Sequence, residues 1–387
     1  MNKFLWFNIR IGLSFIFSCL VMLMFKTPRD GVLSALMILD MTAKDKSSLY
    51  KKLTDEPSVR NDSILTSGGA FLYFDIYTSD ESKPMAGMIV THGFTEKGKD
   101  DKRLQSMARR LARAGFVIMV PDLVQMKHFR LSLQDVDELS LCFDHLKNLK
   151  SVDSNKIGMM GFSFGTGPVL ISMTRPEIRE RVKFGVMFGG YYDLKRSLKY
   201  TLTGAYDAEG YSDRGDVTDK NDRWEFLLGN AALVNSDGTF EHVIQKKIDD
   251  MDYDIMQDAM WLTQEQYNVI TFIGNEDPER FDELYEQIPP SFKTWIDTLS
   301  LYHYSEQIQS KLLIGHSEGD RVVHYTESLS LAHNVPNAPE PFIVVMGLFT
   351  HVNLRIDWES LSAVLNETLP GLYSLWELTF QLLQQRT

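Results

Sequence analysis

The sequence lacks the residue patterns that would build a disulfide framework or a metal centre. Its 387 residues include two cysteines, Cys19 in an apolar run and Cys142 in an expected helix, and no disulfide framework follows from such a pair. A His-Glu-x-x-His motif, a zinc-type Cys/His spacing and a Walker A loop are all missing. We therefore expect neither a metal nor an organic cofactor.

Positive charge is also scarce. Lysine and arginine number 40 against 52 acidic residues, which gives a net charge of −12. A surface of this charge argues against nucleic acid as a partner. Apolar residues make up 44% of the chain, so there is ample material for a hydrophobic core.

The first residues contain one long apolar segment, Phe4 to Phe25, which is long enough to cross a bilayer. Asn8 and Arg10 interrupt its start. Lys3 precedes the segment and Lys26 follows it, so charge does not set an orientation. We expect a single-pass membrane anchor. The alternatives are a signal peptide that is cleaved on export and a soluble helix that packs on the domain.

Beyond this segment, short apolar runs alternate with stretches of helical periodicity, which indicates a mostly parallel sheet flanked by helices. We expect strands at Ala70–Tyr77, Ala86–Val90, Phe116–Val120, Ile157–Met160, Val182–Phe188, Lys311–Ile314 and Pro341–Met346. We expect helices at Gly31–Met41, Asp101–Ala114, Asp135–Leu149, Val323–His333, Trp358–Leu365 and Gly371–Gln385. The polar stretch Lys44–Ser63 is interpreted as a surface connection.

The alternation stops between residues 194 and 305, where the chain is acidic, helical in pattern and rich in large aromatics. Val269–Ile273 is the one stretch there that could be a strand. We interpret this region as a helical cap inserted over the carboxyl edge of the sheet. The expected organisation is an anchor or signal at 1–30, a connection at 31–69, an α/β core at 70–193 and 306–387, and a cap at 194–305.

A serine stands between two glycines where an expected strand runs into a helix, in the sequence Gly161-Phe162-Ser163-Phe164-Gly165. This is the nucleophile-elbow pattern. Glycine gives the sharp turn backbone room, and the N-terminus of the following helix offers free N–H groups to an oxyanion. The alternative is a glycine-rich turn with a capping serine.

Nucleophilic acyl transfer also needs a base and an acid that orients it, in the chain order Ser, Asp or Glu, His. Ser163, Asp320 and His351 occur in that order. Each follows an expected strand, and the carboxyl ends of parallel strands share one edge of a sheet. We therefore predict these three residues as nucleophile, acid and base.

Other residues could fill two of these roles. Asp193, after the strand that follows the elbow, is the main rival for the acid, and Glu318 is a second. His316 and His324 compete for the base. His316 lies in the loop that supplies the acid, and His324 is expected to begin a helix, which favours His351.

Two backbone N–H groups should stabilise the oxyanion. One belongs to the residue after the nucleophile, Phe164, and the other to a loop after an early strand. The sequence His92-Gly93-Phe94 fits that loop, so we predict Phe94 as the second donor.

With these motifs, the chain resembles the α/β-hydrolase-fold serine hydrolases from Ala70 to its end, apart from the insertion. The resemblance rests on the motifs HGF at His92–Phe94, GFSFG at Gly161–Gly165, GHSEGD at Gly315–Asp320 and FTH at Phe349–His351. The layout is similar to that of dienelactone hydrolases, although serine replaces their cysteine nucleophile. A single glycine after His92 differs from the HGGG motif of lipases.

The resemblance implies esters, thioesters, amides or peptides as substrates. We expect hydrolysis of a carboxylic ester or thioester through an acyl-enzyme intermediate, on a small-molecule or lipid-like acyl substrate. A peptidase or amidase with the same triad is one alternative. A non-catalytic binding protein on a hydrolase-like scaffold is another.

Overall fold

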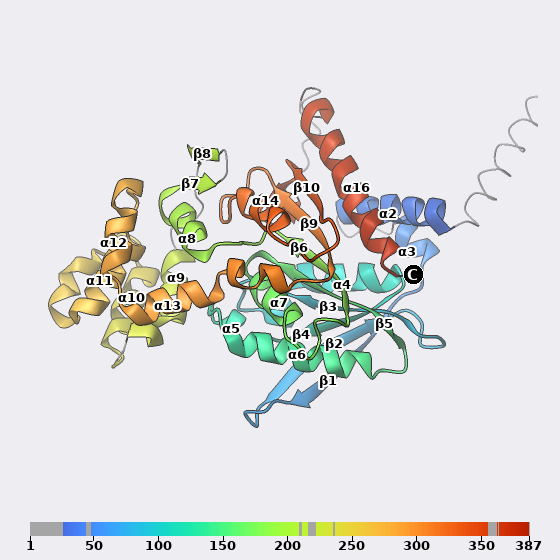
Figure 1. Ribbon diagram of the computed structural model, residues 1–387, viewed down its shortest axis with the longest axis horizontal. Helices are drawn as coiled ribbons and strands as arrows, with labels where there is room; N and C mark the ends of the chain where they lie inside the picture. Colours follow the sequence, from blue (N-terminus) through green and yellow to red (C-terminus); the bar gives the residue numbers. More distant parts are fainter. Residues whose placement is uncertain are drawn as a thin grey trace, which may run out of the picture.

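An eight-stranded sheet forms the centre of the computed structural model, which describes residues 26–43, 48–208, 211–215, 222–234, 237–354, 362 and 364–386 (Figure 1). The strand order is β1-β2-β4-β3-β5-β6-β9-β10. The strands are β1 Ser58–Leu65, β2 Phe71–Thr78, β3 Met85–Thr91, β4 Phe116–Pro121, β5 Val152–Phe162, β6 Val182–Phe188, β9 Lys311–Ser317 and β10 Phe342–Met346. From β4 to β10 all neighbours are parallel, which confirms the prediction of a mostly parallel sheet.

Helices cover both faces of the sheet, and each face has its own hydrophobic core. One core contains apolar side chains of α6 Leu133–Lys147, α7 Thr166–Met173 and α14 Thr326–His333. The other contains those of α2 Lys26–Thr42, α4 Lys102–Arg113 and α16 Leu369–Gln384. The short helices α3 Leu49–Leu53 and α5 Val124–Lys127 complete the flanks. Strands β3 and β4 are buried along their whole length, as expected of strands covered on both faces.

The two ends of the described chain meet on one face, where α2 and α16 lie side by side (Figure 1). Trp376 Nε1 of α16 donates to the Gly31 carbonyl of α2 at 2.8 Å, and Arg386 pairs with the buried carboxylate of Asp30. These contacts tie the first described helix to the last.

The polar stretch Lys44–Ser63 was wrongly interpreted as a plain surface connection. Its last residues, Ser58–Ser63, belong to β1, which pairs antiparallel with β2 from Ser58 opposite Thr78 to Leu65 opposite Phe71. The strand lies at the edge of the sheet, and most of its side chains are exposed. An edge strand of this kind carries little of the buried apolar pattern that reveals a central strand.

Residues 194–305 leave the sheet after β6 and form a group of helices beside it (Figure 1). We call this group the cap. Its helices are α8 Leu194–Thr203, α9 Asp222–Gly229, α10 Thr239–Asp249, α11 Gln264–Ile273, α12 Phe281–Gln287 and α13 Pro290–Leu299. A small hairpin, β7 Ala205–Ala208 and β8 Tyr211–Arg214, was not predicted.

The prediction that Val269–Ile273 could be a strand of the cap is wrong, because these residues form the end of α11. The helix starts at a capping box in which Thr263 and Gln266 bond each other's backbone N–H groups. Its apolar residues Val269, Ile270, Phe272 and Ile273 are buried in the core that continues from the sheet into the cap, where either secondary structure would bury them.

The two ends of the cap meet at one point. The Leu194 N–H donates to Ser300 Oγ at 3.1 Å, and the Leu301 N–H donates to the Tyr192 carbonyl at 2.8 Å. The chain therefore leaves and re-enters the α/β core beside the carboxyl end of β6.

Two predictions concern residues outside the described ranges. The apolar segment Phe4–Phe25 is one, and most of Trp358–Leu365 is the other. Within the described ranges, no helix combines the length and hydropathy that a membrane crossing requires.

Candidate active site

Ser163 stands at the sharp turn between β5 and α7. The strand ends at Phe162, and a single 3-10 turn, Ser163–Gly165, leads directly into the helix. The φ angle of Ser163 is 51°, in the left-handed region that non-glycine residues seldom adopt. Such a strained residue persists where its surroundings hold it, and these sites are often functional.

Close backbone contacts explain the glycines around this serine. A Cβ on Gly161 would lie 2.7 Å from Thr166 Cα, and one on Gly165 would lie 2.1 Å from the His92 carbonyl oxygen. Neither distance can be relieved without moving the backbone. The glycines therefore let the turn fold tightly against α7 and against the loop after β3.

Ser163, His351 and Asp320 form a continuous hydrogen-bonded chain. Ser163 Oγ lies 2.7 Å from His351 Nε2, and His351 Nδ1 lies 2.7 Å from Asp320 Oδ2. Ser163 follows β5 and Asp320 follows β9, while His351 comes after β10 and the short strand β11, Phe349–Thr350, so these segments deliver the three residues to one place. The chain requires a proton on Nδ1, donated to the carboxylate, which leaves Nε2 free to accept the serine proton.

His351 shares an unusual backbone conformation with the serine. Its φ angle is 56°, and it follows the two-residue strand β11 Phe349–Thr350, which pairs with β12 Asn353–Leu354. This small hairpin directs the imidazole toward Ser163. Positive φ angles are uncommon for non-glycine residues, although histidine adopts them more often than most, so the sequence alone did not indicate this conformation.

Asp320 is almost fully buried and strongly hydrogen-bonded. Burial opposes its ionisation, but the charge of His351 and hydrogen bonds from His316 and His351 outweigh burial, so the pKa of Asp320 lies well below its usual range. Its Oδ1 also accepts from the N–H groups of Val322 at 2.8 Å and Val323 at 3.0 Å. The carboxylate is therefore charged and held rigidly.

His316 also lies against this carboxylate, near the same oxygen that His351 contacts. Its Nε2 is 2.9 Å from the Val323 carbonyl oxygen and 3.4 Å from Asp320 Oδ2, and its Nδ1 is 2.6 Å from Ser328 Oγ. The side chain is fully buried. His316 thus packs against the acid. It lies within β9, and not in the following loop as the sequence analysis expected.

The other rival residues have different partners. Asp193 caps α8, since its carboxylate accepts from the Arg196 N–H at 3.1 Å. His324 stacks on Tyr206 of the cap with ring centroids 3.5 Å apart. Glu318 is exposed. None of these three rivals has a described hydrogen bond to His351 or Ser163.

The two predicted oxyanion donors lie side by side next to the nucleophile. The rings of Phe94 and Phe164 stack with centroids 4.8 Å apart, and a Cβ on the intervening Gly93 would lie 2.9 Å from Ser163 Cβ. The loop after β3 therefore runs directly against the serine, as a second oxyanion donor from that loop requires.

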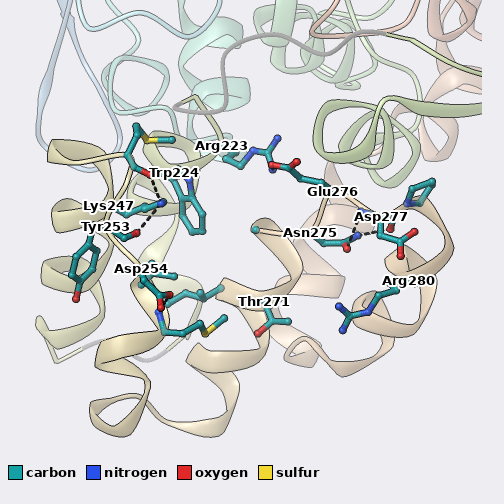
Figure 2. A pocket seen from close by; sticks show the side chains of 16 residues that line it. Arg223, Trp224, Lys247, Tyr253, Asp254, Thr271, Asn275, Glu276, Asp277 and Arg280 are labelled. Carbon is teal, nitrogen blue, oxygen red and sulfur yellow. Dashed lines mark hydrogen bonds and ion pairs between the residues drawn. The ribbon is translucent and has the colours of Figure 1, made fainter.

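Two cavities meet at Ser163 and His351. The first, about 220 Å³, lies toward α4 and β12. The second, about 150 Å³, lies toward the cap, and we call it the cap-side cavity. Its walls are mainly apolar, from Phe94, Phe129, Phe164, Leu198, Leu202, Phe226, Ile273 and Val322. A larger cleft of about 840 Å³ lies wholly within the cap (Figure 2).

The described residues include no cluster of three His, Cys, Asp or Glu side chains that could hold a metal ion.

Comparison with known proteins finds similar solved structures and no similar sequences. No family model matches the sequence, and no curated protein matches it. An acylaminoacyl peptidase from Pyrococcus horikoshii is similar over 87% of this chain and 43% of its own, with a TM-score of 0.50 and 13% identity. A putative dipeptidyl aminopeptidase IV from Bacteroides ovatus is similar over 86% of this chain and 36% of its own (TM-score 0.48, 17% identity).

A smaller protein completes the comparison. A Pyrococcus furiosus esterase is similar over 84% of this chain and 92% of its own, with a TM-score of 0.45 and 12% identity. Our chain thus spans less than half the length of the two peptidases and most of the length of the esterase. At sequence identities this low, likeness in structure shows the fold and does not identify the substrate. The chain has the α/β-hydrolase fold, as the resemblance of its motifs implied.

Proposed function

We propose that this protein is a serine hydrolase that cleaves a carboxylic ester or thioester through an acyl-enzyme intermediate. The observation that carries the proposal is the chain of two 2.7 Å hydrogen bonds from Ser163 through His351 to Asp320. A buried ionised carboxylate, an oriented imidazole and a serine on a strained turn are the parts that such chemistry needs.

In the proposed reaction, Ser163 Oγ attacks the substrate carbonyl as its proton passes to His351 Nε2. Asp320 stabilises the imidazolium that forms. The backbone N–H groups of Phe94 and Phe164 stabilise the oxyanion, and His351 then donates the proton to the leaving group. A water molecule, activated in the same way, attacks the acyl carbonyl and releases Ser163.

The surroundings of the serine favour an acyl group with an apolar body. Phe94, Phe164 and Phe226 line the cap-side cavity together with aliphatic side chains. Aromatic and aliphatic walls bind hydrocarbon by removing its surface from water. This supports a small-molecule or lipid-like acyl substrate and gives no reason to prefer an amide.

Labelling with a fluorescent fluorophosphonate, followed by peptide mass mapping, tests the proposal on purified protein. We expect the label on Ser163, with no label on a Ser163→Ala variant. Ser291→Ala, an exposed serine on α13, is the matched control and should label as the wild type does. Absence of label in a folded sample would point instead to a non-catalytic binding protein.

A panel of matched p-nitrophenyl esters, thioesters and p-nitroanilides then separates the enzyme classes. We expect kcat/KM for the esters to exceed that for the anilides by at least 100-fold. Comparable rates for anilides would assign the same three residues to a peptidase or amidase.

We also propose that Phe4–Phe25 anchors the protein to a membrane as a single span. Its length and apolar composition support this. Full-length protein should stay with membranes washed in alkaline carbonate, and protein that starts at Lys26 should not. Recovery of a processed N-terminus in the medium or periplasm would identify a cleaved export signal instead.

A further inference from the structure

One buried cation lines the catalytic cavity. Arg223 is the second residue of α9, and its side chain is 5% exposed. It lines the cap-side cavity together with Ser163 and His351, and it also lines the larger cleft inside the cap. In Figure 2 its side chain extends across the rim of that cleft toward Glu276. Arg223 therefore contributes to the walls of both spaces.

The guanidinium of Arg223 has few partners among the described residues. Nη2 donates to the Leu202 carbonyl at 3.4 Å, and Nη1 lies 3.9 Å from a Glu276 carboxylate oxygen, too far for a hydrogen bond. A guanidinium carries five N–H donors. The described residues give Nε and Nη1 no hydrogen bond, and neither atom is sealed from solvent. These donors are open to a ligand.

Arg103, another arginine near the catalytic serine, differs from Arg223 because its donors are already paired. Arg103 lines the cavity toward α4, where its Nε and Nη2 bond both oxygens of Asp101 at 3.1 and 2.8 Å, so its fork is already occupied. Among the described residues, no carboxylate lies within hydrogen-bond distance of Arg223. Its ion-pair partner Glu276 is 3.9 Å away and exposed, so water screens the pair, and the preceding residue, Asp222, is exposed as well.

Burying a cation without a full set of partners costs free energy. Burial lowers the pKa of Arg223, which reflects this cost. A ligand carboxylate would remove the deficit, because it accepts two parallel, charge-assisted hydrogen bonds from a guanidinium. The apolar walls between Ser163 and Arg223 suit a hydrocarbon chain that joins such a carboxylate to the scissile carbonyl.

We propose that Arg223 is a specificity-determining residue that binds a carboxylate on the substrate, so that the preferred substrates are monoesters of dicarboxylic acids. This inference rests on the proposed serine-hydrolase function and adds a substrate class to it. The cap-side cavity would hold the apolar chain of the acyl group, and the carboxylate at the end of that chain would bind the guanidinium of Arg223.

The test compares two esters that differ in one end group, p-nitrophenyl hydrogen adipate and p-nitrophenyl hexanoate, with spontaneous hydrolysis subtracted. We expect the wild type to prefer the adipate. Arg223→Met should lower the adipate-to-hexanoate ratio of kcat/KM by about 10- to 100-fold, the range of a hydrogen bond to a charged group, mainly through KM. Arg223→Lys keeps the positive charge, so its adipate-to-hexanoate ratio should fall less than that of Arg223→Met.

Arg280→Met is the matched control, since Arg280 lines the cleft in the cap but not the cap-side cavity. The adipate-to-hexanoate ratio of kcat/KM in this variant should stay within twofold of the wild-type ratio. An unchanged ratio in Arg223→Met, with Ser163 still labelled by the fluorophosphonate, would overturn this inference and leave the hydrolase function standing. Failure of Ser163 to label in the folded wild type would overturn both.

Discussion

The sheet and the cap contribute to the same cavity in different ways. In the proposed reaction the sheet supplies the reacting atoms, because Ser163, Asp320 and His351 each follow a strand and are joined by short hydrogen bonds. The cap supplies walls, among them Phe226 and the buried Arg223. Under the proposed function, chemistry and selectivity come from separate parts of the chain, so substitutions in the two parts should affect different kinetic quantities.

The largest expected effect lies on the sheet side. Ser163→Ala should lower kcat/KM for a p-nitrophenyl ester by about 10⁴- to 10⁶-fold, because the nucleophile is lost. The substitution removes one oxygen that borders the two cavities and keeps the Cβ, so circular dichroism and thermal unfolding should match the wild type. An active, folded Ser163→Ala protein would show that the sheet edge does not hold the nucleophile.

The acid gives the next largest effect. Asp320→Asn should lower kcat about 10³- to 10⁴-fold, because an amide cannot stabilise the imidazolium or hold the required tautomer. Asp193→Asn is the matched control. Asparagine caps helices as well as aspartate does, so both activity and stability should stay close to wild type. A larger loss in Asp193→Asn would move the acid to the end of β6.

Acid pH should weaken the contact between sheet and cap. Burial, helped by the charge of His316, lowers the pKa of His324 to about 4. Between pH 6.5 and 4 the unfolded chain therefore binds a proton that the folded chain does not, and stability falls as the pH falls. Solvent screening limits the loss to about 1 to 2 kcal/mol.

Thermal unfolding of the wild type and of His324→Gln, measured from pH 7.5 to 4.5, tests this prediction. The variant should show a shallower decline, while the contribution of His92, whose burial also lowers its pKa, remains in both proteins. Parallel curves would show that His324, stacked on Tyr206 of the cap, carries no pH dependence of stability.

The smallest expected effect concerns a bond that joins the two regions. Tyr200 of α8 donates its hydroxyl proton to the Asp320 carbonyl at 2.7 Å. Tyr200→Phe should cost about 1 kcal/mol of unfolding free energy, the worth of one hydrogen bond, and lower kcat a few-fold. Denaturant unfolding and ester kinetics measure both. A loss of kcat above 100-fold would mean that the cap takes part in the chemistry rather than forming walls.

Local pattern was enough to predict the central strands and the order of Ser163, Asp320 and His351. Buried parallel strands are short apolar runs, and the residues that follow them share one edge whatever the rest of the chain does. The edge strand β1 could not be found in this way, because its side chains are mostly exposed.

The cap was harder to predict for a different reason. Val269–Ile273 is an apolar run that suits a strand or a buried helix, and packing within the cap decided for α11. The burial of Arg223 and its place beside Ser163 depend on contacts between segments far apart in the chain. No pattern around residue 223 encodes them.

The meeting point of the two cap ends has a consequence for how such a protein can change. Leu194 bonds to Ser300, and Leu301 bonds to Tyr192, so the inserted residues begin and finish at neighbouring positions. A gene segment that encodes everything between these two points could be exchanged for another without altering the register of β6 and β9. Recombination at two sites would then give a new cap in one event, with the hydrogen-bonded arrangement of Ser163, His351 and Asp320 inherited intact.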